Sequence, residues 1–269
     1  MRSRTKFEEK TYDYDGVKIR YVDLGEGEPI MFLHGLGGAI EDNDACFEYL
    51  ADEYRVIAMD CPGTGFSDKP DRNYDIYYLV DFTLDFADRL GLDSFYLVGG
   101  SQGGMQVLLC CDKAPDRIRK AVVYSPSGVW KAKPLAAKFI RLMPPWFVRP
   151  LMHITSLFWN SPGYPEYRQA RREALEFIDN AELPGFGRHV LGCLASQLER
   201  DFRPVYAGIK TPVRIIWGQH DFGMNVKMGR ELVTVIPGSE LIEVPRAGHN
   251  VSTELPEYFA ERVKEFIKE

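Results

Sequence analysis

Two patterns of hydrophobic and polar positions alternate along most of the chain. Short apolar or alternating runs predict strands, and longer segments with apolar residues every three or four positions predict helices. The expected strands are residues 6–14, 17–24, 30–33, 55–59, 94–98, 118–124, 213–217 and 241–244. Asp15-Gly16 lies between the first two strands and is a strong signal for a hairpin turn. Several of the later runs are continuously apolar, which is typical of strands covered on both faces.

Helical periodicity fills the gaps between these strands, at residues 43–51, 76–90, 102–113, 226–235 and 256–268. This alternation predicts a parallel sheet with helices on both faces. From residue 129 to residue 208 no buried strand is apparent, and residues 133–142, 167–179 and 187–199 have helical spacing. We therefore expect an α/β core made of residues 1–128 and 209–269, with a helical cap at 129–208 inserted after the sixth strand.

Composition and charge argue against nucleic-acid binding, metal binding by cysteines and insertion into a membrane. The chain has 269 residues and a formal net charge of -6, which argues against nucleic acid as a partner. The five cysteines lack metal-type spacing and are expected to be reduced thiols. No secretory signal or bilayer-spanning run is apparent, so we expect a cytoplasmic protein without stable membrane insertion. Residues 142–159 are apolar but contain three prolines, and binding of this segment to a membrane surface stays open as an alternative.

The stretch Leu-Val-Gly-Gly-Ser-Gln-Gly-Gly-Met at residues 97–105 is the most informative motif. Ser101 follows an expected strand and precedes an expected helix, with Gly99 and Gly103 two positions away on either side. This context fits a nucleophile elbow, in which glycines leave room for a strained serine whose hydroxyl points out of the sheet. Ser101 is therefore the candidate nucleophile.

A serine hydroxyl needs a base, and the base needs an acid that orients it. His249 follows the last expected strand and Asp221 follows the strand before it, so both belong at the same sheet edge as Ser101. The order serine, acid, histidine is the order expected for an elbow of this kind. The remaining histidines are interpreted as structural, packing or surface residues: His34, His153, His189 and His220.

A hydrolytic serine also needs backbone donors for the oxyanion of its tetrahedral intermediate. We expect these donors to be the N–H of Gln102 and the N–H of Leu36, with Gly37 as the second choice after Leu36. Leu36 lies in the glycine-rich loop that follows the third expected strand. The arrangement implies no metal and no organic cofactor.

The chain resembles the α/β-hydrolase superfamily over nearly its full length. The matching segments are His34-Gly35, the turn at 60–68, the GGSQGG elbow, Trp-Gly-Gln-His-Asp at 217–221 and Ala-Gly-His at 247–249. The resemblance implies a mostly parallel eight-stranded sheet with a helical cap and a Ser-His-Asp triad. It is greatest to the capped branch, which includes esterases, carbon–carbon bond hydrolases, haloperoxidases, epoxide hydrolases and haloalkane dehalogenases. The last two groups use an aspartate nucleophile, whereas this chain has Ser101.

The sequence therefore predicts a carboxylesterase or lipase-like serine hydrolase that acts on small apolar esters. The candidate substrate-binding residues are Gly35, Trp130, Trp146, Phe158 and Phe186. Two alternatives stay open. One is hydrolysis of a carbon–carbon bond in a ring-cleavage product, for which Arg188 or Arg141 is available to hold a carboxylate. The other is a small-molecule receptor that keeps the hydrolase fold.

Overall fold

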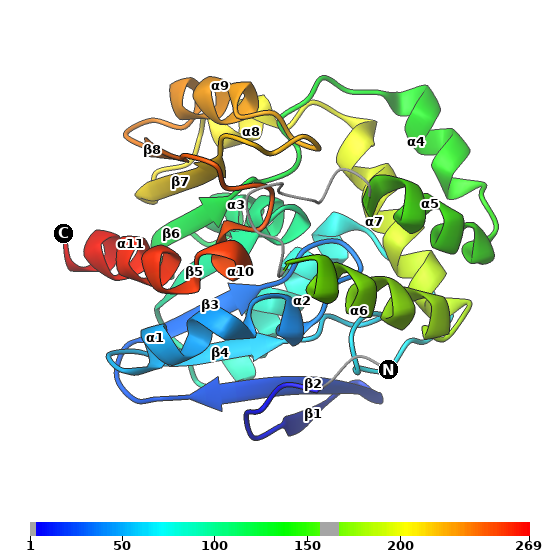
Figure 1. Ribbon diagram of the computed structural model, residues 1–269, viewed down its shortest axis with the longest axis horizontal. Helices are drawn as coiled ribbons and strands as arrows, with labels where there is room; N and C mark the ends of the chain where they lie inside the picture. Colours follow the sequence, from blue (N-terminus) through cyan, green and yellow to red (C-terminus); the bar gives the residue numbers. More distant parts are fainter. Residues whose placement is uncertain (1–3, 157–166) are drawn as a thin grey trace.

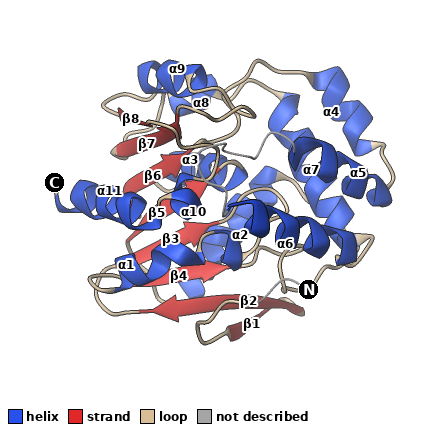
Figure 2. Ribbon diagram, viewed as in Figure 1, coloured by secondary structure: helices blue, strands red, loops and turns tan. Residues whose placement is uncertain are grey.

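An eight-stranded β-sheet runs through the computed structural model, which describes residues 4–156 and 167–269 (Figures 1 and 2). The strands lie in the order β1-β2-β4-β3-β5-β6-β7-β8. β2 pairs antiparallel with both β1 and β4, and every later pairing is parallel. The strands are β1 (Lys10–Tyr14), β2 (Val17–Leu24), β3 (Pro29–Leu33), β4 (Arg55–Met59), β5 (Phe95–Gly100), β6 (Ile118–Tyr124), β7 (Val213–Gly218) and β8 (Glu240–Val244). The expected fold class, an α/β-hydrolase sheet that is mostly parallel, is confirmed.

Helices cover both faces of the sheet, so alternate residues of each central strand enter two different cores. In β3, Met31 and Leu33 pack on one face, and Ile30 and Phe32 pack on the other. The first face is covered by α2 (Ile76–Arg89), α3 (Gln102–Lys113), α8 (Arg203–Tyr206) and α9 (Lys227–Val235). The second is covered by α1 (Phe47–Ala51), α10 (Val251–Glu254) and α11 (Pro256–Lys268). Burial on both faces explains the continuous apolar runs in the sequence.

Most expected elements differ from the observed ones by at most two residues at an end, and two differ by more. The first strand begins at Lys10 rather than at residue 6. The helix expected at 43–51 is replaced by the 3₁₀ turn Asp44–Cys46 and the short α1, and another 3₁₀ turn, Ile40–Asp42, precedes them. Asn43 separates the two turns with φ -134° and ψ -3°, and its side-chain oxygen accepts hydrogen bonds from the hydroxyls of Ser252 and Tyr124. This side-chain bonding holds Asn43 outside a continuous helix.

Between β6 and β7 the chain forms a group of helices that we call the inserted helices. They are α4 (Pro134–Arg141), the 3₁₀ turn Pro145–Phe147, α5 (Val148–Ser156), α6 (Tyr167–Asn180) and α7 (Gly185–Glu199). Pro150 is the third residue of α5, where a missing N–H breaks no helical hydrogen bond. A small apolar cluster, which includes Val148, Ile178, Phe186 and Val190, holds these helices together.

The helix α7 connects the inserted helices to the sheet. Ser196 Oγ accepts the N–H of Ile76 at 3.0 Å, and His189 Nδ1 lies 2.8 Å from the carbonyl oxygen of Pro62. These contacts fix α7 along the edge of the sheet from which the catalytic candidates project.

All five cysteines are buried and unpaired, as expected for reduced thiols. Across the described ranges, 4–156 and 167–269, no helix combines the length and the apolar character needed to cross a membrane.

A buried ion pair supports the loops beneath the candidate site. Arg20 Nη1 donates to Asp60 Oδ2 at 2.9 Å, and Arg20 Nη2 donates to Glu41 at 2.6 Å. The two oxygens of Asp60 also accept the backbone N–H groups of Ile40 and Phe66, at 2.8 and 2.7 Å. Asp60 therefore links the end of β4 to two loops, which supports the interpretation of the 60–68 segment as a structural turn.

We predict that Asp60→Asn lowers the free energy of unfolding by about 3 kcal/mol, because it leaves the buried Arg20 charge less well compensated. An amide also loses one of the two acceptors that hold the loops. Urea denaturation followed by circular dichroism measures the change. The matched control is Asp71→Asn, which removes an exposed ion pair with Arg188 and should cost less than about 1 kcal/mol. Equal losses in the two variants would contradict a supporting role for Asp60.

Candidate active site

Ser101 lies at the sharp turn between β5 and α3 with φ 52° and ψ -120°, a strained conformation for a residue with a side chain. The flanking glycines are required by space. A Cβ atom on Gly103 would lie 2.3 Å from the Leu33 carbonyl oxygen, and one on Gly99 would lie 2.7 Å from the Gly103 carbonyl oxygen. Side chains at these positions would therefore push the helix away from the sheet.

Asp221 and His249 lie in the loops that follow β7 and β8. His249 Nδ1 lies 2.7 Å from Asp221 Oδ2, and the Asp221 side chain is fully buried. The other oxygen of Asp221 accepts the backbone N–H groups of Gly223 and Met224. Both carboxylate oxygens thus have partners, so the carboxylate is held in one orientation toward the imidazole.

Close backbone packing brings these two loops together. A Cβ atom on Gly218, the last residue of β7, would lie 2.1 Å from the carbonyl oxygen of Gly248. The N–H of His220 also donates to the carbonyl oxygen of Ala247 at 2.8 Å. The loop that carries the acid is therefore joined directly to the loop that carries the histidine.

A cavity of about 570 Å³ lies over this edge of the sheet, between the sheet and the inserted helices. Ser101 and His249 both line it, while Asp221 lies behind His249. The glycine-rich loop after β3 forms another part of the wall, and a Cβ atom on Gly35 would lie 4.0 Å from Ser101 Oγ. The structure thus brings the three expected catalytic residues to one site.

Comparisons with known proteins agree with this fold. The sequence profile of the alpha/beta hydrolase fold matches residues 28–152. Haloalkane dehalogenase 2 of Mycobacterium tuberculosis (strain ATCC 25618 / H37Rv) is 30% identical over 282 aligned positions, which cover 96% of this chain and 94% of the relative. The chain belongs to the α/β-hydrolase family.

Two further relatives show the breadth of this family. A 2-hydroxy-6-oxononadienedioate/2-hydroxy-6-oxononatrienedioate hydrolase of Dechloromonas aromatica (strain RCB) is 26% identical, with 93% of this chain and 91% of the relative covered. The crystal structure of the enol-lactonase from Burkholderia xenovorans LB400 superposes with a TM-score of 0.80 at 22% identity, covering 97% of this chain and all of that chain. Proteins similar to this chain over nearly its full length therefore have names that state different activities.

The expected oxyanion donors belong to two segments beside Ser101. Gln102 is the first residue of α3, so its N–H has no acceptor within the helix. Leu36 lines the cavity within a tight turn, in which Gly38 N–H donates to the Gly35 carbonyl oxygen and Gly37 has φ 64°. Positive φ at Gly37 favours glycine there.

His249 also lies close to a second buried carboxylate. Glu254 Oε2 accepts the backbone N–H of Gly248 at 2.7 Å and so holds the histidine loop in place. Burial alone would lower the pKa of His249, but the charge and hydrogen bond of Asp221 and the charge of Glu254 raise it overall. Burial raises the pKa of Glu254 itself. These charges stabilise the imidazolium, the form that a histidine adopts after it accepts a proton.

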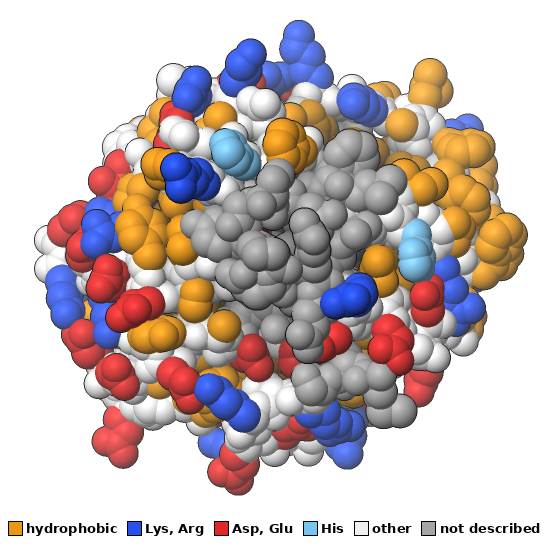
Figure 3. Space-filling model, viewed as in Figure 1, with side chains coloured by type: hydrophobic (Ala, Val, Ile, Leu, Met, Phe, Trp, Pro, Cys, Tyr) orange, Lys and Arg blue, Asp and Glu red, His pale blue; other side chains and the backbone are white. Residues whose placement is uncertain are grey.

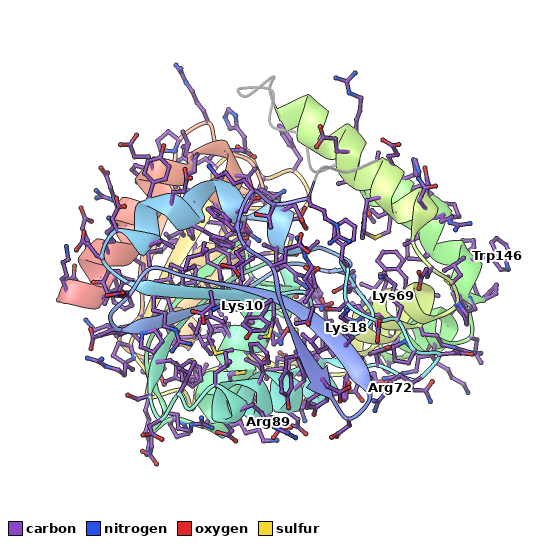
Figure 4. All side chains as sticks on the ribbon, turned by 90° about the horizontal axis from the view of Figure 1, so that it is seen from below. Lys10, Lys18, Lys69, Arg72, Arg89 and Trp146 are labelled. Carbon is purple, nitrogen blue, oxygen red and sulfur yellow. The ribbon has the colours of Figure 1, made fainter. Side chains whose placement is uncertain are left out.

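The aromatic residues expected in the substrate site lie in different places. Gly35 and Trp130 line the cavity. Trp146 does not line it, because its ring is exposed at the outer edge of the inserted helices, where Figure 4 shows it pointing away from the sheet. Phe186 is fully buried in the small core of the inserted helices, where it packs next to Gly37. Phe158 lies outside the described residues.

The other histidines have structural surroundings. His34 Nε2 accepts the N–H of Cys61 at 3.0 Å and braces its loop as expected. Burial lowers the pKa of His189 to about 3, so it is a neutral packing residue. His153 contacts Asp179 on the surface. His220 stacks on Phe222.

The sequence did not reveal the contributions of Glu254 and Asn43. Glu254 reaches Gly248 across six positions that carry no periodic pattern, so only the folded loop connects them. Asn43 lines the cavity and is bonded to Ser252, which is distant in sequence. The one local signal was the polar run at residues 41–44, which interrupts the apolar spacing expected of a helix.

We predict that Asp221→Asn lowers the pKa of His249, because a neutral amide no longer stabilises the imidazolium. Glu254→Gln should lower this pKa by a smaller amount, since Glu254 acts on His249 through its charge while its Oε2 accepts the backbone N–H of Gly248. NMR titration of the His249 ring protons measures both shifts. An unchanged pKa in the Asp221 variant would show that another group controls this histidine.

Proposed function

We propose that this protein is a serine hydrolase that cleaves carboxylic esters of hydrophobic substrates through Ser101, His249 and Asp221. The observation that carries the proposal is the buried 2.7 Å contact between Asp221 and His249 beside the strained Ser101, which shares a cavity with His249. A nucleophile, a base and an orienting acid in this order form the arrangement that acyl transfer needs.

In the proposed reaction, Ser101 Oγ attacks the ester carbonyl carbon while His249 Nε2 accepts its proton. Asp221 accepts the Nδ1–H of His249 and so holds the neutral ring in the tautomer whose Nε2 is free to act as a base. The N–H groups of Gln102 and Leu36 stabilise the oxyanion. His249 then donates its proton to the leaving alcohol, and water releases the acid through the same base.

The cavity walls favour an apolar substrate. Much of the lining is hydrophobic: Leu36, Trp130, Leu151, Met152, Ala174, Phe177, Ile178, Leu194 and Met224. Several of these residues belong to the inserted helices, which supports the proposal that residues 129–208 act as a cap over the site. A largely apolar pocket with a few convergent polar groups is typical of small-molecule sites.

Serine chemistry makes dehalogenation unfavourable at this site, although a dehalogenase is among the relatives. Attack by Ser101 Oγ on a haloalkane carbon would form an alkyl ether. An ether has no carbonyl group for water to attack, so the enzyme would remain alkylated. An acyl ester on the same serine has a carbonyl group, and hydrolysis regenerates the enzyme.

Carbon–carbon bond hydrolysis is less well supported than ester hydrolysis. Arg188 pairs with Asp71 and Arg141 pairs with Glu199, both on the exposed surface and neither in the cavity lining. A receptor role would leave a stable acyl adduct after one turnover. Steady turnover of a p-nitrophenyl ester, compared with a dienoic keto acid, separates these alternatives.

We predict that Ser101→Ala lowers kcat for a p-nitrophenyl ester by about a thousandfold or more, because it removes the nucleophile. It should also abolish labelling by a fluorophosphonate. The matched control is Ser127→Ala, since Ser127 lines the same cavity and, among the described residues, its hydroxyl hydrogen-bonds only to Met105 Sδ, at 3.7 Å. This control should stay within about threefold of wild type. Wild-type turnover by the Ser101 variant would contradict the proposed nucleophile.

We predict that esters bearing a distal carboxylate are hydrolysed about tenfold less efficiently than neutral esters of equal length. Arg4 is the one Lys or Arg among the described lining residues, and Glu9 pairs with it at 2.7 Å. A substrate carboxylate that enters the cavity would therefore lose its hydration without forming an ion pair with an unpaired cation, so its binding would be unfavourable. The measurement is kcat/KM for p-nitrophenyl butyrate against the mono-p-nitrophenyl ester of a dicarboxylic acid. Preference for the charged ester would favour the carbon–carbon hydrolase alternative.

A further inference from the structure

The helix α4 presents its apolar face to solvent. Leu135, Phe139 and Leu142 recur at helical spacing, and they are 84%, 65% and 75% exposed. The opposite face carries Ala137, the only residue of α4 that is fully buried, and α4 packs against α7. An amphipathic helix in a globular protein normally turns its apolar stripe inward. The inverted orientation of α4 indicates that its outer face has a binding partner.

The apolar surface continues beyond α4. Trp146 in the following 3₁₀ turn is 59% exposed, and Ile154 on α5 is 58% exposed. Figure 3 shows hydrophobic side chains gathered along the edge of the molecule over α4 and α5, and Figure 4 shows Trp146 projecting outward from this edge. We call these residues the α4 surface: Leu135, Phe139, Leu142, Trp146 and Ile154.

The charges around the α4 surface are mostly positive, although the whole chain has a net charge of -6. No aspartate or glutamate occurs in the sequence from residue 117 to residue 165. Lys131, Lys133 and Lys138 are exposed, and none of them forms an ion pair with a described residue. Acids of other elements beside this surface have partners, since Glu199 pairs with Arg141 and Asp201 pairs with Arg203. Asp179 contacts His153, the residue before Ile154.

We propose that the α4 surface docks this protein on a membrane that carries anionic lipids. Exposed Leu, Phe and Trp side chains next to free lysines are the combination that binds the interface of an anionic bilayer. The apolar side chains would enter the boundary between headgroups and acyl chains, and the lysines would contact the headgroups. Since no described helix can span a bilayer, the protein would lie on the surface.

A second copy of the chain fits this surface less well. A two-fold dimer would place the same patch on both partners. Lys131, Lys133 and Lys138 of one copy would then face the same lysines of the other. Like charges brought together in an interface disfavour association. An anionic bilayer instead supplies the opposite charge across the whole patch.

Docking through α4 would also orient the cavity. Leu151 and Met152 of α5 line the cavity, while Ile154 of the same helix belongs to the α4 surface. The inserted helices would therefore lie between the bilayer and the site. The proposal rests on the surface alone and does not depend on which bond the site cleaves.

The test is flotation of the purified protein with phosphatidylcholine vesicles, with and without phosphatidylglycerol. Wild type should float with the anionic vesicles and remain largely unbound with the neutral ones. Leu135→Glu/Phe139→Glu should lose this binding. Circular dichroism and turnover of a water-soluble p-nitrophenyl ester should match wild type, because neither residue lines the cavity.

A charge series tests the lysines separately. Lys131→Gln/Lys133→Gln/Lys138→Gln should weaken partitioning onto anionic vesicles by about fivefold for each lysine neutralised. The matched control is Lys18→Gln/Lys210→Gln/Lys227→Gln, which makes the same change in net charge with exposed lysines of the α/β core. This control should bind like wild type.

Any of four results would overturn the proposal. In the first, wild type fails to float with anionic vesicles. In the second, Leu135→Glu/Phe139→Glu floats as wild type does. In the third, analytical ultracentrifugation finds a dimer that the same double variant dissociates, which would assign the α4 surface to a second copy. Equal loss of binding in both lysine triples would also count against it, because it would indicate general charge attraction without a specific surface.

Discussion

Direct backbone contact at the carboxyl edge of the sheet is the constraint on which the site depends. Gly103 lets α3 approach the end of β3, and Gly218 lets the end of β7 touch the histidine loop. A methyl group at either position would meet a carbonyl oxygen at 2.3 Å or less. Because neighbouring strands end at the same edge, these two contacts fix the distances between groups that are far apart in sequence. The geometry of the candidate site is therefore set mainly by glycines, which allow these close backbone contacts.

Buried carboxylates also help to hold the groups of the candidate site in position. The Asp221 carboxylate is buried, and its cost of desolvation is offset by two backbone N–H groups and the His249 ring. Glu254 adds a second negative charge near the imidazole and also fixes its loop through Gly248. Farther from the cavity, Asp60 and Arg20 hold the loop after β3 by a similar buried pairing. In each case a buried carboxylate serves as an acceptor that positions backbone.

The sheet could be predicted because local patterns encode it, and the same patterns placed the three candidate catalytic residues in loops at one edge of the sheet. The expected bounds of α3, β6 and α11 match the structure, since Gly99 and Gly100 precede α3 and Pro115, Pro126 and Pro256 mark the other ends. The pocket residues could not be predicted in the same way. Trp146 and Phe186 look equivalent in sequence, yet one is exposed and the other is buried. The many aromatic residues predict that the helical layer has an apolar core of its own. The packing of its helices decides which ring faces the cavity.

The inserted helices have two distinct sides: one lines the cavity, and the other carries the exposed α4 surface. Their inner side chains form a small core and line the cavity, so the apolar residues that remain on α4 are not required to stabilise the layer. Exposed apolar side chains lower solubility and invite aggregation, so their retention on one helix face needs a compensating role. The lysines beside them limit self-association, because two copies would bring the same charges together. Apolar side chains and cations on one face therefore restrict the partner to a surface that is both apolar and anionic.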